Sequence, residues 1–505
     1  MTMRKYRFLL GAVLCALCFV SCTDSSKYVN ALPDDAAAVV AVNLEQMAAK
    51  SGVDEKTAAS FAEALKGEIQ GADELVDRIA KDPSESGLDL KDKVYLFASP
   101  SGSLAGLLAR VSDSGKVGRM LELLKQQQVC EEPVESDGCT WTVAGASLVA
   151  YTDAAFLIVA EPGRSDARTL QHRVSMLLRQ GDGEGFAAGA DFGRLKDAAE
   201  DVAALLSLDL LPRTYVAPLT MGVSAELNLT NVKCLATLNF EEGKAVLEAE
   251  PLIADKLMAE MLEKQRKASG RVKGTYLDLF PANTGVWMTG NMDGGKIFDL
   301  LCENPTVRQQ FESSMMPVDF KLIFNSIKGD MALAVPNPAE SGSFIAYADV
   351  TNRDFLQTFE DLKPLLALTG GTMTLKNNGT DEYEFRMTDG SAINLPPGNA
   401  SFWFGVKDGR FYLTNDRSLV VRRVPGLTLR DCEWGGRVKG KMFYLAVSVK
   451  DLAAKTASAS GMARVAPVLQ LSDYVTVESA DGKKVRMEWV MKDRKKNVLR
   501  QFTAF

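Results

Sequence analysis

Apolar residues in this chain gather in short runs bounded by glycine, proline, asparagine and aspartate. Runs of this length, rich in β-branched and aromatic residues, predict β-strands. Glu242-Gly243 and Asp481-Gly482 each separate two such runs and supply the positive φ angles that tight hairpin turns need. The runs cover residues 39–44, 90–100, 104–111, 147–159, 234–240 and 245–250, then 286–290, 327–336, 344–350, 401–414, 474–479 and 484–491. Hairpins dominate, so the pairing is expected to be antiparallel.

Helical spacing of apolar residues marks other stretches between these runs. The longest, residues 44–81, is rich in alanine, glutamate and lysine, and shorter ones cover 117–124 and 355–362. Between the two halves, apolar positions from 253 to 262 precede the charged segment 263–267. This pattern predicts a connecting helix that buries one apolar stripe.

Five segments of the first half return in the second half in the same order. One shared segment would mean little, but a shared order indicates a duplicated unit. We therefore expect an α+β fold built from two tandem repeats of a mainly antiparallel sheet with helices packed on one face. The predicted boundaries are a signal peptide at 1–21, a tether at 22–30, a first repeat at 31–252, a connecting helix and linker at 253–273, and a second repeat at 274–505.

The first residues have the pattern of an export signal. Three basic residues among the first seven precede an apolar run over 8–20, which is too short to span a bilayer. The run ends at Cys22, and the segment resembles a bacterial lipobox, in which this cysteine is acylated and becomes the first residue of the mature protein. We expect a lipid-anchored protein of the cell envelope, with the outer membrane favoured and the periplasmic and surface faces both open.

A chain of 505 residues is too long to fold around one hydrophobic core, so two or three domains are expected. Its charge is unevenly distributed. The net charge is −7, yet residues 401–505 hold 20 Lys and Arg against 10 Asp and Glu. A basic last quarter could face an anionic partner such as a lipid headgroup or a polysaccharide, or complement the acidic remainder of the chain. An exported acidic chain is not expected to bind nucleic acid.

Five cysteines would remain after the signal peptide is removed and Cys22 is acylated. An odd number leaves at least one free thiol. Cys130 and Cys139 flank a turn-like segment, which makes them the candidate disulfide in an oxidising compartment. None of these five cysteines belongs to a Cys-x-x-Cys pair, and we expect neither a metal nor a cofactor.

Catalytic motifs are largely missing from the sequence. The single histidine, His172, is expected on the solvent side of a helix, which argues against serine–histidine and histidine–metal chemistry. The glycines of segment 183–188 follow a helix and not a strand, so a dinucleotide site is not expected. A hydrolase needs only two carboxylates that meet in space, and the candidates are Asp89 with Asp92, or a group formed by Asp381, Glu382 and Glu384.

The Cys22 lipobox, the segment 28–44 with its Leu-Pro-x-Asp-Ala opening, and the helix ending at Gly52 together carry a family resemblance. On these residues the chain resembles an uncharacterised family of Bacteroidetes lipoproteins known as domain of unknown function 4836. The resemblance implies an envelope lipoprotein and supplies no catalytic motif. We therefore expect a non-catalytic binding or structural role at the membrane, with an envelope protein or polysaccharide as partner. An envelope hydrolase acting on glycan or peptidoglycan through a carboxylate pair is the alternative, and enzymatic activity stays open.

Overall fold

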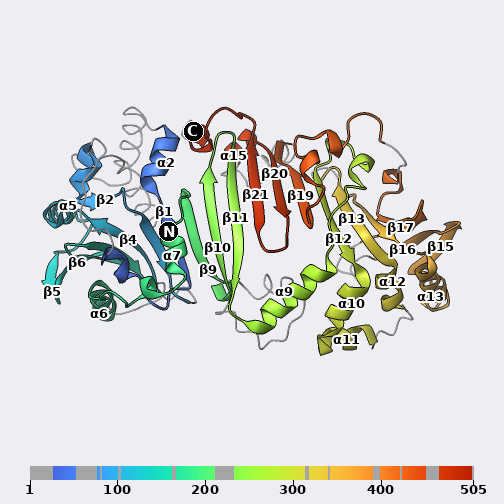
Figure 1. Ribbon diagram of the computed structural model, residues 1–505, viewed down its shortest axis with the longest axis horizontal. Coiled ribbons are helices and arrows are strands. Elements are labelled where there is room, and N and C mark those ends of the chain that lie inside the picture. The colour runs from blue at the N-terminus through green and yellow to red at the C-terminus, as the bar shows by residue number, and fades with distance from the viewer. Residues whose placement is uncertain are drawn as a thin grey trace. The chain divides into compact units, whose positions relative to one another are not determined.

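The computed structural model forms two compact units, each containing a large antiparallel sheet with helices (Figure 1). Unit 1 comprises Met1–Arg213, Leu229–Leu252 and Arg494–Phe505, and unit 2 comprises Thr214–Asn228 and Ile253–Asp493. The described residues are 27–52, 77–79, 82–100, 104–161, 167–210, 232–312, 318–338, 342–389, 398–420, 424–450 and 466–502. Among them, no helix combines the length and the apolar character needed to cross a membrane.

The strands of unit 1 form an open ladder in the order β10, β9, β1, β3, β4, β8, β7, β6, β5. The short strand β2 (Leu88–Asp89) pairs with the far end of β4. A turn at Gly243 leads from β10 into β11 (Lys244–Ile253). The other bounds are β1 Ala38–Val42, β3 Val94–Ala98, β4 Ala105–Val111, β5 Val134–Ser136, β6 Cys139–Ala144, β7 Ser147–Tyr151, β8 Ala155–Ala160, β9 Val202–Ser207 and β10 Val232–Phe240.

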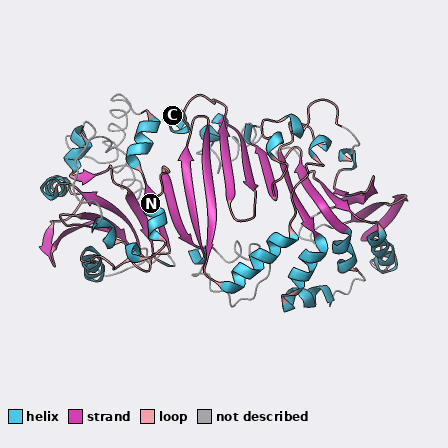
Figure 2. Ribbon diagram, viewed as in Figure 1, coloured by secondary structure: helices cyan, strands magenta, loops and turns pink. Residues whose placement is uncertain are grey.

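Helices cover both faces of this sheet (Figure 2). Because side chains alternate along a strand, Leu108 of β4 faces one core while its neighbours Leu107 and Ala109 face the other. The first core includes η1, α6 and α7, whereas α2 and α5 pack on the opposite side. The expectation that helices pack on one face is not confirmed. The helices are η1 Lys27–Ala31, α2 Leu44–Ser51, η2 Pro83–Ser86, α5 Ser114–Gln126, α6 Ala167–Leu178, η4 Phe186–Ala188, α7 Phe192–Lys196, η5 Leu208–Leu210 and α16 Val498–Phe502.

The last described residues belong to unit 1. Asn497 donates its side-chain amide to Phe240 O at 2.9 Å, and the N–H of Val498 donates to Glu241 O at 3.1 Å. The N–H of Gly243 donates in return to Lys496 O at 2.9 Å. Helix α16, which follows, lies against α2. The C-terminal segment is thereby fastened to the turn between β10 and β11.

The strands of unit 2 form a ladder in the order β21, β20, β19, β12, β13, β14, β18, β17, β16, β15, with every pair antiparallel. The bounds are β12 Val286–Asp293, β13 Ile327–Val335, β14 Ile345–Val350, β15 Met373–Gly379, β16 Glu382–Met387, β17 Ala400–Lys407, β18 Arg410–Thr414, β19 Phe443–Ser448, β20 Ser472–Ser479 and β21 Val485–Met491.

Unit 2 also has a core on each face of its sheet. On one face, Trp434 stacks between Trp287 and Tyr444, with ring centroids 5.7 and 5.6 Å apart. On the other face, Phe404 packs against Phe359 of α13. The helices are α9 Lys256–Ala268, η7 Leu277–Leu279, α10 Gly294–Cys302, α11 Pro305–Glu312, α12 Phe320–Ser326, η8 Asp354–Leu356, α13 Gln357–Ala367, η10 Arg417–Leu419, η11 Leu429–Asp431, η12 Gly435–Arg437 and α15 Ala466–Leu471.

A fully buried carboxylate fixes the segment that enters the unit 2 core. Asp330 of β13 accepts the backbone N–H groups of Lys273, Gly274 and Thr275 at 2.9–3.1 Å. It also accepts the Thr275 hydroxyl at 3.1 Å and the Asn291 amide at 2.8 Å. A buried charge is tolerated only when its hydrogen bonds are satisfied, and here donors surround both oxygens.

Several predicted elements are confirmed. A helix, α9, is present in the stretch where one was predicted, and it buries Met258 and Met261, although Leu257 is exposed. The expected hairpins are present, with Gly243 and Gly482 at positive φ. Of the helical stretch predicted over 44–81, α2 ends at Ser51, and residues 53–76 and 80–81 lie outside the described residues.

Candidate functional site

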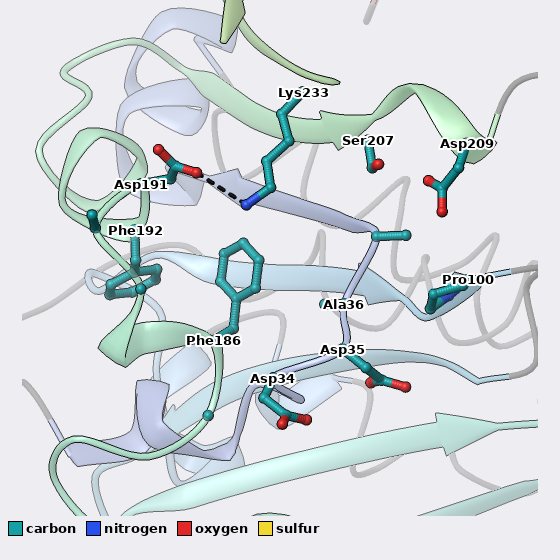
Figure 3. Close-up of a pocket in the computed structure, with 14 residues that line it drawn as sticks. Asp34, Asp35, Ala36, Pro100, Phe186, Asp191, Phe192, Ser207, Asp209 and Lys233 are labelled. Carbon is teal, nitrogen blue, oxygen red and sulfur yellow. Dashed lines mark hydrogen bonds and ion pairs between the residues drawn. The ribbon is translucent and has the colours of Figure 1, made fainter. Parts of the chain in front are cut away.

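Unit 1 contains a cavity of about 280 Å³ at one end of its sheet (Figure 3). Five segments that are distant in the sequence supply its lining. The lining residues are Asp34, Asp35, Ala36, Ala37, Pro100, Gly185, Phe186, Gly189, Ala190, Asp191, Phe192, Ser207, Asp209 and Lys233.

Antiparallel pairing explains why these segments meet. The start of β1, the end of β3, the end of β9 and the start of β10 all lie at the same end of the sheet. Lys233 is directly opposite Ser207 in the ladder, and the N–H of Ser207 donates to Ala37 O at 2.7 Å. The ends of four strands therefore form the floor of the cavity.

The segment carrying η4 and α7 forms the facing wall. Gly185 has φ of +66°, and a Cβ atom there would lie 2.6 Å from Leu32 O and 2.7 Å from Asn30 O. The absence of a side chain lets the chain run against η1, where the N–H of Phe186 donates to Leu32 O at 3.1 Å. The glycines predicted to form a loop thus direct Phe186 into the cavity lining.

Helix α7 is held in place by Lys93. The Lys93 ammonium donates to the carbonyl oxygens of Leu195, Lys196 and Ala198 at 3.2, 2.6 and 2.6 Å. Burial lowers the pKa of Lys93 from its usual value. A cation at the C-terminal end of a helix satisfies carbonyls that have no partner within the helix. This cap keeps Phe192, at the other end of α7, against the cavity.

Some charged groups of the cavity have a partner of opposite charge and others do not, among the described residues. The Lys233 ammonium pairs with Asp191 at 3.0 Å. Asp35 accepts the Ser99 hydroxyl at 3.1 Å and lies 3.4 Å from Arg173. Asp209 Oδ1 is shielded from solvent and has no hydrogen-bond partner in the described part of the chain. Four aspartates against one lysine leave the lining with a net negative charge.

The first carboxylate pair suggested by the sequence is bound to an arginine. Asp89 and Asp92 lie 3.3 and 2.6 Å from the Arg110 guanidinium, and both Asp89 and Arg110 are buried. The structure therefore brings Asp89 and Asp92 together, but around a buried cation. The arrangement serves to satisfy charges inside the unit.

The second carboxylate group is dispersed over separate ion pairs in unit 2. Asp381 pairs with Arg353 at 2.6 Å, and Glu384 pairs with Arg386 at 2.5 Å. Glu382 pairs with Arg417. Each carboxylate thus has its own guanidinium.

The candidate disulfide partners are free thiols in this structure. Cys130 Sγ contacts Leu121 O at 3.5 Å, whereas Cys139 Sγ contacts Ser136 O and Ser175 Oγ, each at 3.5 Å. Burial raises the pKa of the Cys130 thiol, which makes it a poor nucleophile. The Cys130–Cys139 bridge stays a prediction. Cys22, the predicted lipidation site, lies outside the described residues.

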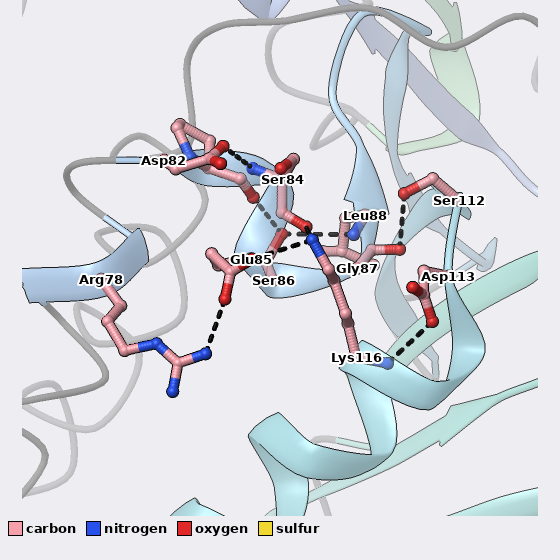
Figure 4. Close-up of polar contacts among 11 residues, drawn as sticks. Arg78, Asp82, Ser84, Glu85, Ser86, Gly87, Leu88, Ser112, Asp113 and Lys116 are labelled. Carbon is pink, nitrogen blue, oxygen red and sulfur yellow. Dashed lines mark hydrogen bonds and ion pairs between the residues drawn. The ribbon is translucent and has the colours of Figure 1, made fainter.

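A second polar cluster in unit 1 joins η2 to α5 (Figure 4). The Lys116 ammonium pairs with Glu85 at 2.9 Å, and Arg78 pairs with the same carboxylate at 2.6 Å. Hydrogen bonds from these two cations lower the pKa of Glu85 to about 2. Backbone N–H groups of Ser112 and Asp113 donate to Gly87 O at 2.8 and 3.1 Å. Glu85 is paired with both cations, and its pair with Lys116 stabilises the fold by joining η2 to α5.

The histidine and the possibility of a metal site, both considered from the sequence, can be compared with the described residues. His172 is exposed on α6, as predicted, while Leu170, Val174 and Leu177 on the same helix are buried. In the described ranges, no three histidine, cysteine or acidic side chains are close enough together to hold a metal ion.

The cavity residues were not predicted from the sequence. Asp34 and Asp35 belong to the Leu-Pro-x-Asp-Ala opening, and Asp191, Asp209 and Lys233 belong to no motif named above. The sequence offered one signal for this site: acidic residues are concentrated near the ends of segments, and antiparallel pairing brings these ends together.

Comparison with solved structures finds only distant likeness. Crystal forms IV, I and III of a protein called TP0453 match with 9, 10 and 10% sequence identity and TM-scores of 0.27, 0.27 and 0.26. The matches cover 45, 50 and 50% of this chain and 81, 88 and 89% of the other. TM-scores this low carry no argument about this chain. No curated protein matches it.

A family model described as "Domain of unknown function (DUF4836)" matches residues 28–499. The match begins within η1 and ends within α16, so it includes the strands of both units and the cavity. The chain belongs to the DUF4836 family.

Proposed function

We propose that the chain is a lipid-anchored protein of the cell envelope that binds a ligand in the unit 1 cavity without catalysing a reaction. The observation that carries this proposal is the cavity itself, with converging polar groups and two aromatic rings in its lining. The carboxylates that the sequence offered for a hydrolase are held by arginines, which favours binding over hydrolysis.

A cavity-filling variant tests the binding role. Ala190 lines the cavity at an exposed position, so Ala190→Trp should obstruct the cavity and leave the core unchanged. Ala188→Trp, at an exposed position of η4 outside the lining, is the matched control. Native mass spectrometry of protein purified from cell envelopes should detect a small molecule on the parent chain and on Ala188→Trp, and none on Ala190→Trp. Equal occupancy in all three, or none in any, contradicts the proposal.

A separate assay tests the non-catalytic part. The purified chain is incubated with peptidoglycan and with envelope polysaccharide, and soluble fragments are measured. No release above a boiled control is expected. Release that disappears in a carboxylate variant of the cavity would instead establish the hydrolase alternative.

The anchor is proposed at Cys22, on the lipobox pattern. Residues Tyr28–Ala31 of η1 are buried in unit 1, although the predicted tether extends to residue 30. An acylated Cys22 would therefore lie at most about 18 Å along the chain from Lys27, which holds unit 1 close to the membrane. Cys22→Ala should release the protein from membranes and abolish labelling with a fatty-acid analogue. Retention of both contradicts the anchor.

We also propose that the two units are tandem repeats, as the sequence predicted. The nine-strand order of unit 1 corresponds to the order from β20 to β15 in unit 2, and each unit has a core on both sheet faces, which supports the repeat. An experimental structure of the chain tests it, because superposition of β1–β10 on β12–β20 should align strand on strand in the same register. Failure to align the central strands would overturn the repeat.

A further inference from the structure

We propose that the unit 1 cavity binds an organic ammonium group, an inference that rests on the proposed binding role and specifies its ligand. The ligand class follows from three properties of the lining: uncompensated negative charge, aromatic walls, and carboxylates too far apart for one metal ion.

Negative charge remains after the internal pairs are counted. Asp191 and Lys233 neutralise each other at 3.0 Å. Asp35 pairs at 3.4 Å with Arg173, whose guanidinium also pairs with Glu161 at 3.4 Å. Asp34 and Asp209 also line the cavity, and Asp209 Oδ1 has no hydrogen-bond partner among the residues that the structure describes. Two carboxylates of the lining are thus left without a cation among the described residues, and a cavity lined by one sign of charge favours a ligand of the opposite sign.

The walls suit an organic cation. Phe186 and Phe192 lie 6.3 Å apart between ring centroids with their planes at 87°. In this edge-to-face arrangement at least one ring can present its face to the cavity, and aromatic faces attract alkylammonium groups. Ala36, Ala37 and Pro100 add apolar surface for the alkyl part of such a ligand.

A metal ion fits the lining poorly. Divalent cations require several oxygen ligands within about 2.6 Å of one point. The carboxylates of this cavity come from separate segments, and no group of three in the described chain meets the spacing for a metal. A larger cation can contact carboxylates on opposite walls.

Calorimetric titration of the purified chain with choline tests the inference. The neutral isostere 3,3-dimethyl-1-butanol has the same shape without the charge. We expect choline to bind and the alcohol to bind at least about tenfold more weakly, because the carboxylates act only on the charge. Equal binding of the two, or no binding of choline, overturns the ammonium assignment.

Charge variants localise the binding. Asp209→Asn should weaken choline binding about tenfold, and Lys233→Met should strengthen it severalfold by freeing Asp191. Asp153→Asn, at an exposed turn position outside the lining, should leave it unchanged. Circular dichroism confirms that each variant folds. Unchanged binding by folded Asp209→Asn and Lys233→Met places the cation elsewhere and refutes the site.

The ammonium group could belong to a free compound or to a lipid headgroup. Binding of free choline alone identifies the first, and preferential sedimentation with phosphatidylcholine over phosphatidylglycerol vesicles identifies the second. If no ammonium probe binds while Ala190→Trp still removes a native ligand, the ligand class is wrong and the binding role stands. If Ala190→Trp also has no effect, the proposed function fails with it.

Discussion

The ammonium of Lys50, at the end of α2, lies 2.8 Å from the carboxylate of Asp201, which is completely buried. Asp201 also accepts the N–H of Phe240 at 2.6 Å, and Lys50 donates to the Asn239 side chain at 2.6 Å. The pair thus joins α2 to the adjoining ends of β9 and β10.

Lys50→Met should destabilise unit 1 by about 3 kcal/mol, because it leaves a buried carboxylate without its cation. Hydrogen exchange measured by mass spectrometry should show faster exchange in peptides from β9 and β10. Lys196→Met, at an exposed position of α7, is the control and should change little. Equal exchange in both variants would mean that the pair does not contribute to stability.

Asp330→Asn should destabilise unit 2 by about 3–5 kcal/mol, since one acceptor oxygen becomes a donor facing backbone N–H groups. Urea unfolding monitored by tryptophan fluorescence measures the loss. Asp319→Asn is the matched control, because Asp319 caps α12 at an exposed position and asparagine caps equally well. A loss as small as that of the control contradicts the role assigned to Asp330.

Gly87→Ala should be much more costly than Gly138→Ala. Both glycines have positive φ, +77° and +76°, which costs alanine about 1 kcal/mol. At Gly87 an added Cβ would also lie 2.4 Å from Asp113 O, whereas at Gly138 it meets nothing within 4 Å. The difference between the unfolding temperatures of the two variants measures the cost of the steric clash at Gly87 apart from the cost of positive φ, which both positions share. Similar values would show that the backbone around Gly87 moves freely.

Glu85→Gln should remove a pH-dependent part of the stability of unit 1. The folded pKa of Glu85 lies near 2, below its usual value of 4.5, because Lys116 and Arg78 favour the charged form. The stabilisation is therefore fully present above pH 4.5 and is lost as the pH falls towards 2. The difference in unfolding temperature between parent and variant should shrink over this range at low salt. Glu135→Gln, an exposed control, should show no such trend.

The sequence predicted strands and hairpins well because these depend on local signals. Alternation marked both strands of each hairpin, and Gly243 and Gly482 marked their turns. The edge strand β5 and its neighbour β6 were missed. They flank Asp137 and Gly138, in a segment where polar residues conceal the alternation.

The cavity could not be predicted, because its residues meet only through long-range pairing. Nothing local to Lys233 indicates that it lies opposite Ser207, and nothing local to Asp34 places it near Asp191. The helices on both sheet faces were missed for a similar reason. Helical spacing shows that Val117 and Leu121 form a buried stripe but not which face of the sheet they cover.

The fastening of Asn497 and Val498 to the β10–β11 turn has a consequence for biosynthesis. A chain emerging from the ribosome has Ile253–Asp493 of unit 2 between Leu229–Leu252 of unit 1 and this closing segment. Unit 1 therefore cannot finish folding until the last residues are made, whereas unit 2 is complete earlier. A protein interrupted shortly before its end would keep an intact second unit and an unfinished first one, so premature termination would first impair the unit that contains the cavity.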